Sequence, residues 1–115
     1  MSDAIIVCGG RNFADYTLLC LTLDAIDPRP EIVAHGAATG ADALAGHWAR
    51  LSGATEMAFT ANWGRYGPSA GPRRNAEMLA QMAPRLVVAF PGGRGTADMV
   101  RKARAAGVPV MEVKP

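Results

Sequence analysis

The sequence predicts a Rossmann-like α/β fold, in which helices cover both faces of a five-stranded parallel sheet. Short apolar runs rich in β-branched residues alternate with longer segments whose apolar residues recur at helical spacing. Hydrophobic residues make up 50% of the chain and aromatic residues only 6%, a balance that favours helices packed closely on a sheet. The length of 115 residues fits one domain, so residues 1–115 are expected to fold as a single unit.

The first strand is expected over residues 4–8, an apolar run that two glycines close. Asp15 is placed to cap a helix, since aspartate accepts hydrogen bonds from free N–H groups at a helix start. Apolar residues recur at helical spacing until Pro28 ends this helix. Residues 31–35 then form the second strand.

The second helix follows Gly40 and runs to about Leu51, and residues 55–59 form a weaker third strand. Pro72 is expected to open the third helix, because the first turn of a helix does not need the N–H that proline lacks. Pro84 ends this helix.

Residues 85–90 are the clearest strand of the sequence, and the last helix follows Thr96 and ends at Ala106. Residues 108–113 supply the last strand. Successive parallel strands need right-handed helical crossovers, and a strand order of 3-2-1-4-5 is expected. In this order the winding reverses between the first and fourth strands, and a crevice opens at their carboxyl ends.

Two glycine-containing loops are expected to meet at this crevice. Residues 91–96 (Pro-Gly-Gly-Arg-Gly-Thr) join a strand to a helix, where glycines let backbone N–H groups approach an anion at the positive helix end. Residues 36–42 form a similar junction that matches no standard phosphate motif. The alternative is that both are tight turns without a ligand, in which Asp42 only stabilises a helix start.

The loop of residues 60–71 is long for a compact domain, which is typical of functional loops. Trp63 and Tyr66 within it could stack on a nucleobase, or pack within the loop or against a second subunit. Arg73 and Arg74 follow at a helix start, where cations are unfavourable unless an anion compensates them. The loop therefore favours phosphate recognition, with solvated or paired arginines as the alternative.

The composition excludes several classes of protein. The net charge of +2 is too small to indicate nucleic-acid or membrane binding by itself, and no apolar stretch reaches the ~20 residues of a membrane span. Cys8 and Cys20 have no metal spacing and no disulfide pattern, and no basic leader opens the chain. We therefore expect a cytoplasmic protein without a metal site.

Five ordered motifs then resemble the small YspA/YpsA-related branch of the SLOG superfamily. They span nearly the whole chain and comprise Gly9-Gly10-Arg11-Asn12-Phe13, His35-Gly36 with Gly40-Ala41-Asp42, Trp63 with Tyr66-Gly67, Ala70-Gly71-Pro72 with Arg74-Asn75, and Pro91 to Met99. The resemblance implies a Rossmann-like domain that binds or senses a nucleotide or a nucleotide derivative. The superfamily includes the Lonely Guy phosphoribohydrolases, which release a base from nucleoside monophosphates, and the DNA-binding DprA proteins.

The resemblance leaves hydrolysis open. In the hydrolases the glycine motif ends in a catalytic glutamate that acts with an upstream arginine, and this chain has Met99 at that position. Asp98 is adjacent, but one residue on a helix means a rotation of about 100°. The resemblance therefore gives Arg74 and Asp98 as the candidate catalytic pair, with Arg73 as the alternative arginine.

The leading hypothesis is a nucleotide-binding domain that needs no cofactor besides its ligand and forms a homodimer. Phosphoribohydrolase activity on a nucleoside 5′-monophosphate is the alternative. DNA binding through Arg94, Arg101, Lys102 and Arg104 is the third, and nucleic acid is not the expected partner. The predicted ligand-binding residues are Gly9, Gly10, Arg11, Gly36, Gly40, Asp42, Trp63, Arg73, Arg74, Asn75, Pro91, Gly92, Gly93, Gly95 and Thr96.

Overall fold

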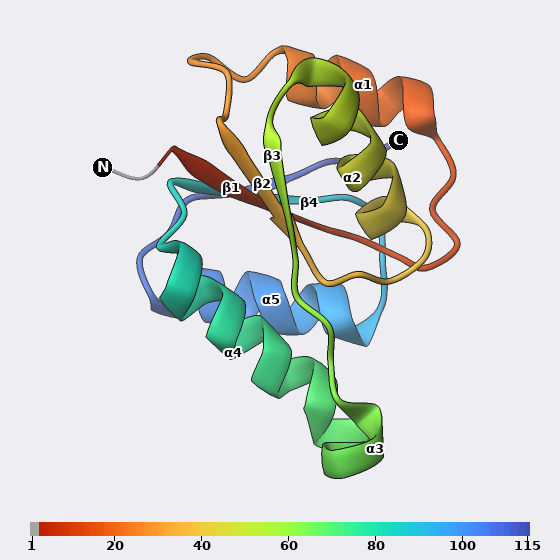
Figure 1. The fold of residues 1–115 in the computed structure, drawn as a ribbon, viewed down its shortest axis with the longest axis vertical. Coiled ribbons are helices and arrows are strands. Elements are labelled where there is room, and N and C mark those ends of the chain that lie inside the picture. Colours follow the sequence, from red (N-terminus) through yellow and green to blue (C-terminus); the bar gives the residue numbers. More distant parts are fainter. Residues whose placement is uncertain (1–2) are drawn as a thin grey trace.

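The computed structural model describes residues 3–115 and confirms the Rossmann-like α/β fold (Figure 1). In this range all strands pair in parallel, in the predicted order β3-β2-β1-β4-β5. The strands are β1 (Ala4–Cys8), β2 (Ile32–His35), β3 (Thr55–Ala58), β4 (Leu86–Ala89) and β5 (Val110–Glu112). The helices are α1 (Tyr16–Asp24), α2 (Ala41–Ser52), α3 (Trp63–Tyr66), α4 (Ala70–Met82) and α5 (Arg94–Ala105), with a 3-10 turn η1 (Gly67–Ser69).

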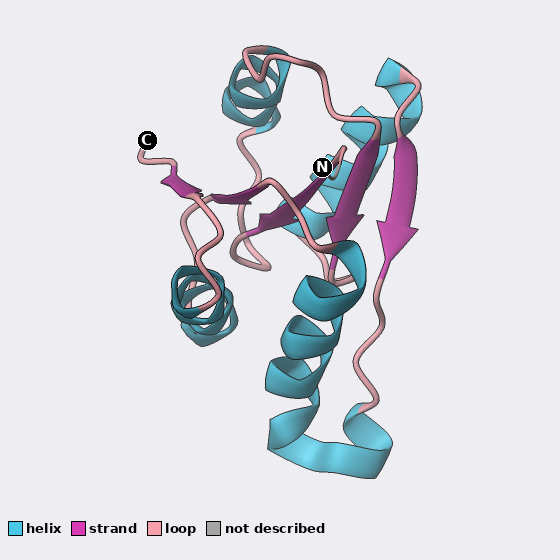
Figure 2. Ribbon diagram, turned by 90° about the vertical axis from the view of Figure 1, so that its left-hand side faces the viewer, coloured by secondary structure: helices cyan, strands magenta, loops and turns pink. Residues whose placement is uncertain are grey.

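Helices cover both faces of the sheet, α1 and α2 on one side and α4 and α5 on the other (Figures 1 and 2). Alternation along β1 explains the two layers, because neighbouring residues of a strand point to opposite faces. Ile5 and Val7 pack with α1 and α2, whereas Ile6 packs with α4 and α5. The buried cluster on the second side comprises Ile6, Ala34, Met78, Val87, Met99 and Ala103.

Local chemistry sets the start of α1, as predicted, and the end of α2. The Asp15 carboxylate accepts a hydrogen bond from the backbone N–H of Leu18 at 3.0 Å and so caps α1. Gly53 ends α2 in the left-handed conformation, with a φ of 82° that costs glycine little.

Two helix starts differ from the prediction. Helix α4 begins at Ala70 and carries Pro72 within its first turn, where the missing N–H of proline costs no helical hydrogen bond. The preceding loop contains α3 and η1, which lie at the far end of α4 (Figure 1). Helix α5 begins at Arg94 with Gly93 as its N-cap, so Gly95 and Thr96 belong to its first turn. The glycine motif thus forms the helix start itself.

Candidate functional site

A pocket of about 860 Å³ opens at the carboxyl ends of β1, β2 and β4, where the winding of the sheet reverses. Residues that are far apart in the sequence meet there. The predicted site residues that line it are Gly9, Gly10, Arg11, Gly36, Asp42, Trp63, Arg74, Asn75, Gly93, Gly95, Thr96 and Asp98.

Three predicted ligand-binding residues do not line this pocket but pack against the loops that do. They are Gly40, Pro91 and Gly92. The Pro91 carbonyl accepts a hydrogen bond from the Gly10 N–H at 2.8 Å, which joins the two glycine loops. A Cβ atom on Gly92 would overlap the Thr96 hydroxyl and lie 2.7 Å from the Gly10 nitrogen. A Cβ atom on Gly40, whose φ is 74°, would overlap the Gly10 carbonyl. These residues allow close packing of the loops around this pocket, and their predicted ligand contacts stay a prediction.

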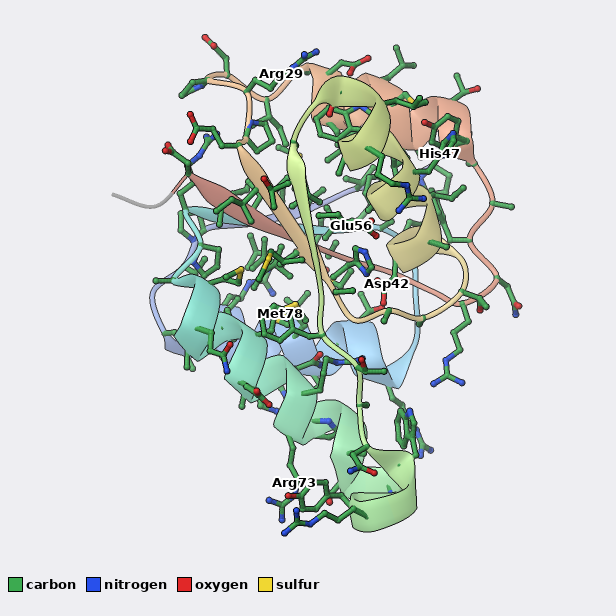
Figure 3. The ribbon with its side chains drawn as sticks, viewed as in Figure 1. Arg29, Asp42, His47, Glu56, Arg73 and Met78 are labelled. Atoms are coloured by element: carbon green, nitrogen blue, oxygen red, sulfur yellow. The ribbon has the colours of Figure 1, made fainter. Side chains whose placement is uncertain are left out.

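Arg73 and Arg74, which the sequence left as alternatives, have different surroundings in the structure. Arg73 lies outside the pocket, with its guanidinium carbon 4.5 Å from the centre of the Tyr66 ring. Its Nε donates a hydrogen bond to the Ser69 hydroxyl at 3.2 Å. Figure 3 shows Arg73 beside α3, far from Asp42 at the sheet edge. The side chain of Arg73 therefore turns toward α3 and does not line this pocket, unlike that of Arg74.

Arg74 is half-buried and faces the pocket. Its Nη1 donates to the Gly36 carbonyl at 2.5 Å and to the Phe59 carbonyl at 3.4 Å, and its Nε donates to Asn75 Oδ1 at 3.0 Å. Among residues 3–115, no carboxylate forms an ion pair with Arg74, and its Nη2 has no hydrogen-bond acceptor. Backbone carbonyls thus hold the guanidinium group of Arg74 in place, while its Nη2 remains available as a hydrogen-bond donor.

The charge of Arg74 is only partly balanced by its surroundings. Burial is the main cause that lowers its pKa, and the nearby positive charge of Arg11 acts in the same direction. The carboxylates of Asp42 and Asp98 oppose this change from a distance. Burying a cation without a direct counterion costs free energy. An anion that binds beside Arg74 would compensate this charge.

The first turn of α5 presents backbone N–H groups without helical acceptors. The N-cap residue Gly93 provides no side-chain cap, and the first helical hydrogen bond runs from the Ala97 N–H to the Gly93 carbonyl at 3.0 Å. Cβ atoms at Gly93 and Gly95 would meet no other atom within 4 Å. The N–H groups of residues 94–96 are therefore available to an anion at the positive end of the helix.

Asp98 is buried and lines the pocket. Its Oδ2 accepts from Asn75 Nδ2 at 3.0 Å, and its Oδ1 accepts from Lys102 at 2.5 Å and from Arg101 at 3.2 Å. Burial alone would raise the pKa of Asp98, but these donors and the charges of Lys102 and Arg101 outweigh it, so the pKa is lowered. Asp98 is a carboxylate at neutral pH.

Asn75 connects this carboxylate to Arg74. It is buried, its Oδ1 accepts from Arg74, and its Nδ2 donates to Asp98 and to the Gly95 carbonyl at 3.2 Å. The oxygen and the nitrogen of its side-chain amide thus both form hydrogen bonds within the protein. Asn75 fixes the relative positions of Arg74 and the α5 start, although the sequence predicted it as a ligand contact.

Asp42 and Cys8 line the pocket, and Asp42 is buried. Burial raises the pKa of Asp42, while a hydrogen bond from the Ala38 N–H at 3.2 Å and the charge of Arg74 oppose the change. Burial, with a smaller contribution from the charge of Asp42, raises the pKa of the Cys8 thiol to about 12. Cys8 is therefore a neutral thiol and a poor nucleophile at neutral pH.

Trp63 and Arg11 form the rim of the pocket opposite the sheet. The Arg11 guanidinium carbon lies 5.8 Å from the centre of the Trp63 ring, and the Trp63 side chain is 47% exposed. Tyr66 is 37% exposed and does not line the pocket. Trp63 is thus open to stacking by a planar group, and a role for Tyr66 in dimer formation stays a prediction.

Sequence reasoning missed a polar cluster beneath the loop after β2. His35 Nε2 and Glu56 Oε2 are 2.6 Å apart, and Arg50 contacts the other oxygen of Glu56. His35 Nδ1 accepts from the Ala37 N–H at 3.0 Å, which holds Ala37 at a φ of 59° where it lines the pocket. A Cβ atom on Gly46 would overlap Glu56. No sequence spacing reveals this cluster, because its contacts form only across the fold.

The Glu56 cluster predicts a dependence of stability on pH. Hydrogen bonds from His35 and Arg50 lower the pKa of Glu56 below 4.5 and outweigh desolvation. A lowered carboxyl pKa contributes stability at neutral pH that is lost as the pH falls through it. Glu56→Gln is expected to reduce the free energy of unfolding by about 1 kcal/mol at pH 7. The difference should shrink as the pH falls below the ordinary carboxyl pKa of 4.5 and through the lowered pKa of Glu56. Urea denaturation at each pH measures it, and a constant difference contradicts it.

Over residues 3–115, no group of three or more His, Cys, Asp or Glu side chains is arranged to hold a metal ion. In the same range, no helix has the length and hydropathy needed to cross a membrane.

Comparisons with known proteins agree with this architecture. A model of the YspA, cpYpsA-related SLOG family matches residues 4–66. The chain belongs to this family. The Gene 61 protein of Mycobacterium phage D29 is 37% identical to this SLOG protein over 117 aligned residues, with 93% of each chain covered. The X-ray structure of TM1055 has the same fold, with a TM-score of 0.71 at 22% identity over 96% of this chain and 72% of TM1055.

Met99 of this SLOG protein does not face the pocket. Its side chain is fully buried between the sheet, α4 and α5, whereas Asp98 lines the pocket. The rotation of about 100° between neighbouring helical residues separates the two. Of these two neighbours on α5, only Asp98 faces the pocket.

Proposed function

We propose that this pocket binds a nucleotide or a nucleotide derivative through its phosphate. The unpaired Nη2 of Arg74 carries the proposal, because this donor lies in the same pocket as the free N–H groups of the α5 start. A guanidinium and a helix N-terminus both bind phosphate through charge-assisted hydrogen bonds. A volume of about 860 Å³ has room for a nucleoside besides the phosphate.

The base would stack on Trp63 at the pocket rim. Trp63 is 47% exposed, and the Arg11 guanidinium over its ring adds positive charge. Stacking on an aromatic ring tolerates different bases, so the indole supports affinity for nucleotides in general.

Ligand binding should stabilise the folded protein. A nucleotide present at 100 times its dissociation constant contributes about 2.7 kcal/mol, because only the folded state binds it. Thermal unfolding is to be measured with AMP, GMP, cyclic nucleotides and dinucleotides, and at least one should raise the midpoint in a concentration-dependent manner. Inorganic phosphate and free adenosine serve as controls. No shift with any member of the panel contradicts the proposal.

Phosphoribohydrolase activity is the second candidate, because Asp98 points inward and Asn75 connects it to Arg74. A carboxylate could stabilise positive charge on a ribose during base release. However, three donors already occupy Asp98 and keep its pKa low, which makes it a weak base and leaves it without a proton to donate.

Little or no base release is therefore expected from the native protein. Incubation with AMP, GMP, CMP and UMP, followed by chromatography of the free bases, measures it. Asp98→Asn is the matched control, because it removes the charge while keeping the shape of the side chain. Robust release that Asp98→Asn abolishes would make the protein an enzyme.

DNA binding receives no support from the last helix. Arg101 and Lys102 pair with Asp98, and Arg104 pairs with Glu112 at 2.7 Å. Of the four cations considered there, only Arg94 has no ion pair among residues 3–115. Paired cations attract phosphates weakly, so the face offers little to a DNA backbone.

A further inference from the structure

A second hollow lies on the other side of the α5 start, between α5 and residues 112–115. Its volume is about 540 Å³. Gly93 and Thr96 line both this groove and the nucleotide pocket. The two hollows are therefore neighbours that share the first turn of α5.

The groove combines an apolar floor with a positive rim. Phe90, Val100 and Val113 contribute apolar surface. The charged lining residues are Arg101, Arg104, Glu112 and Lys114, of which Arg104 pairs with Glu112 and Arg101 pairs with Asp98, so Lys114 is the lining cation without an ion pair among residues 3–115. Such a lining suits a flat, uncharged ring system joined to an anionic group.

Two of the four residues on the ridge between the hollows (residues 93–96) are glycines. Gly93 and Gly95 have no side chain, and Cβ atoms there would meet no neighbour within 4 Å. The ridge also carries the free N–H groups of residues 94–96 at the positive end of α5. A chain of phosphates could cross it in contact with the backbone.

We propose that the groove holds the second nucleoside of a two-headed nucleotide, in which a diphosphate joins two nucleosides. The diphosphate crosses the Gly93–Thr96 turn, one base lies at Trp63 and the other lies in the groove. This inference rests on the proposed nucleotide binding and narrows its ligand class. A mononucleotide would fill the pocket alone and leave the groove empty.

Two alanines of α5 provide a matched test. Ala97 is exposed and lines the groove but not the pocket, whereas Ala105 is exposed on the same helix and lines neither. Ala97→Leu places bulk in the groove, and Ala105→Leu makes the same change elsewhere. Both are surface changes to a good helix former, so both variants should fold.

Isothermal titration with AMP, diadenosine 5′,5′-diphosphate and NAD⁺ tests the proposal. At least one two-headed compound should bind the native protein at least tenfold more tightly than AMP, with one ligand per chain. Ala97→Leu should remove this advantage and leave AMP affinity within twofold, and Ala105→Leu should change neither.

Each other result counts against the proposal in a distinct manner. If AMP binds as tightly as both two-headed compounds, or if Ala97→Leu leaves their affinity unchanged, the groove is not a subsite and nucleotide binding itself stands. Two AMP molecules per chain would assign the groove to a separate mononucleotide. If neither AMP nor the two-headed compounds bind, the proposed function fails together with this inference.

Discussion

Arg74→Ala is expected to weaken nucleotide binding by about 2–5 kcal/mol, which is at least about thirtyfold in affinity. The loss is large because Arg74 is half-buried, is held by the Gly36 and Phe59 carbonyls, and has its Nη2 free for a phosphate. Removing it also leaves Asp42 and Asp98 facing the ligand with less compensating charge. Calorimetric titration with the nucleotide that gives the largest thermal shift measures the effect.

Arg73→Ala is the matched control, since Arg73 precedes Arg74 on the same helix and contacts Tyr66 outside the pocket. It should leave affinity within about twofold. Arg74→Lys should fall between the two, because lysine keeps the charge but cannot reproduce the guanidinium fork. Thermal unfolding midpoints show whether a variant loses affinity because its fold is destabilised. Equal losses from Arg73→Ala and Arg74→Ala would place the phosphate elsewhere.

The two arginines show where sequence reasoning reaches its limit. Their position before the apolar part of α4 predicted an anion site at that helix start. Neighbouring helical residues point about 100° apart, so only one of them can face a given pocket. The choice depends on α3, whose Tyr66 ring lies against Arg73, and the sequence predicted this segment as an irregular loop.

The sequence predicted where the glycine motifs lie in the fold, but it did not predict the role of each glycine. The alternation of strands and helices is a local property that was sufficient to predict a parallel sheet, and the order expected for a Rossmann-like fold is the observed one. Whether a glycine lines a pocket or permits loop packing depends on contacts made across the chain. Gly92 is adjacent to Gly93 in sequence, yet a Cβ on Gly92 would overlap Thr96 while one on Gly93 would meet open space.

Met99→Glu is expected to unfold the protein or to cost more than about 4 kcal/mol of stability. The related hydrolases have glutamate at this motif position, which would make the substitution a test for gained activity. Here the Met99 side chain is fully buried with Ile6, Met78 and Val87. A carboxylate in this cluster would lose its hydration without a compensating partner.

Two controls separate burial from catalysis in this test. Met99→Leu conserves volume and polarity, so it should cost less than about 1.5 kcal/mol. Burial raises a carboxyl pKa above its unfolded value of about 4.3, so the penalty in Met99→Glu should be largest above that pH and should decrease in acid. Denaturant unfolding of both variants at pH 7 and pH 4 measures these differences. A Met99→Glu protein that is as stable as the native one and releases free base would show that position 99 reaches the pocket. That result would require α5 to be turned from the orientation in which Asp98 contacts Asn75.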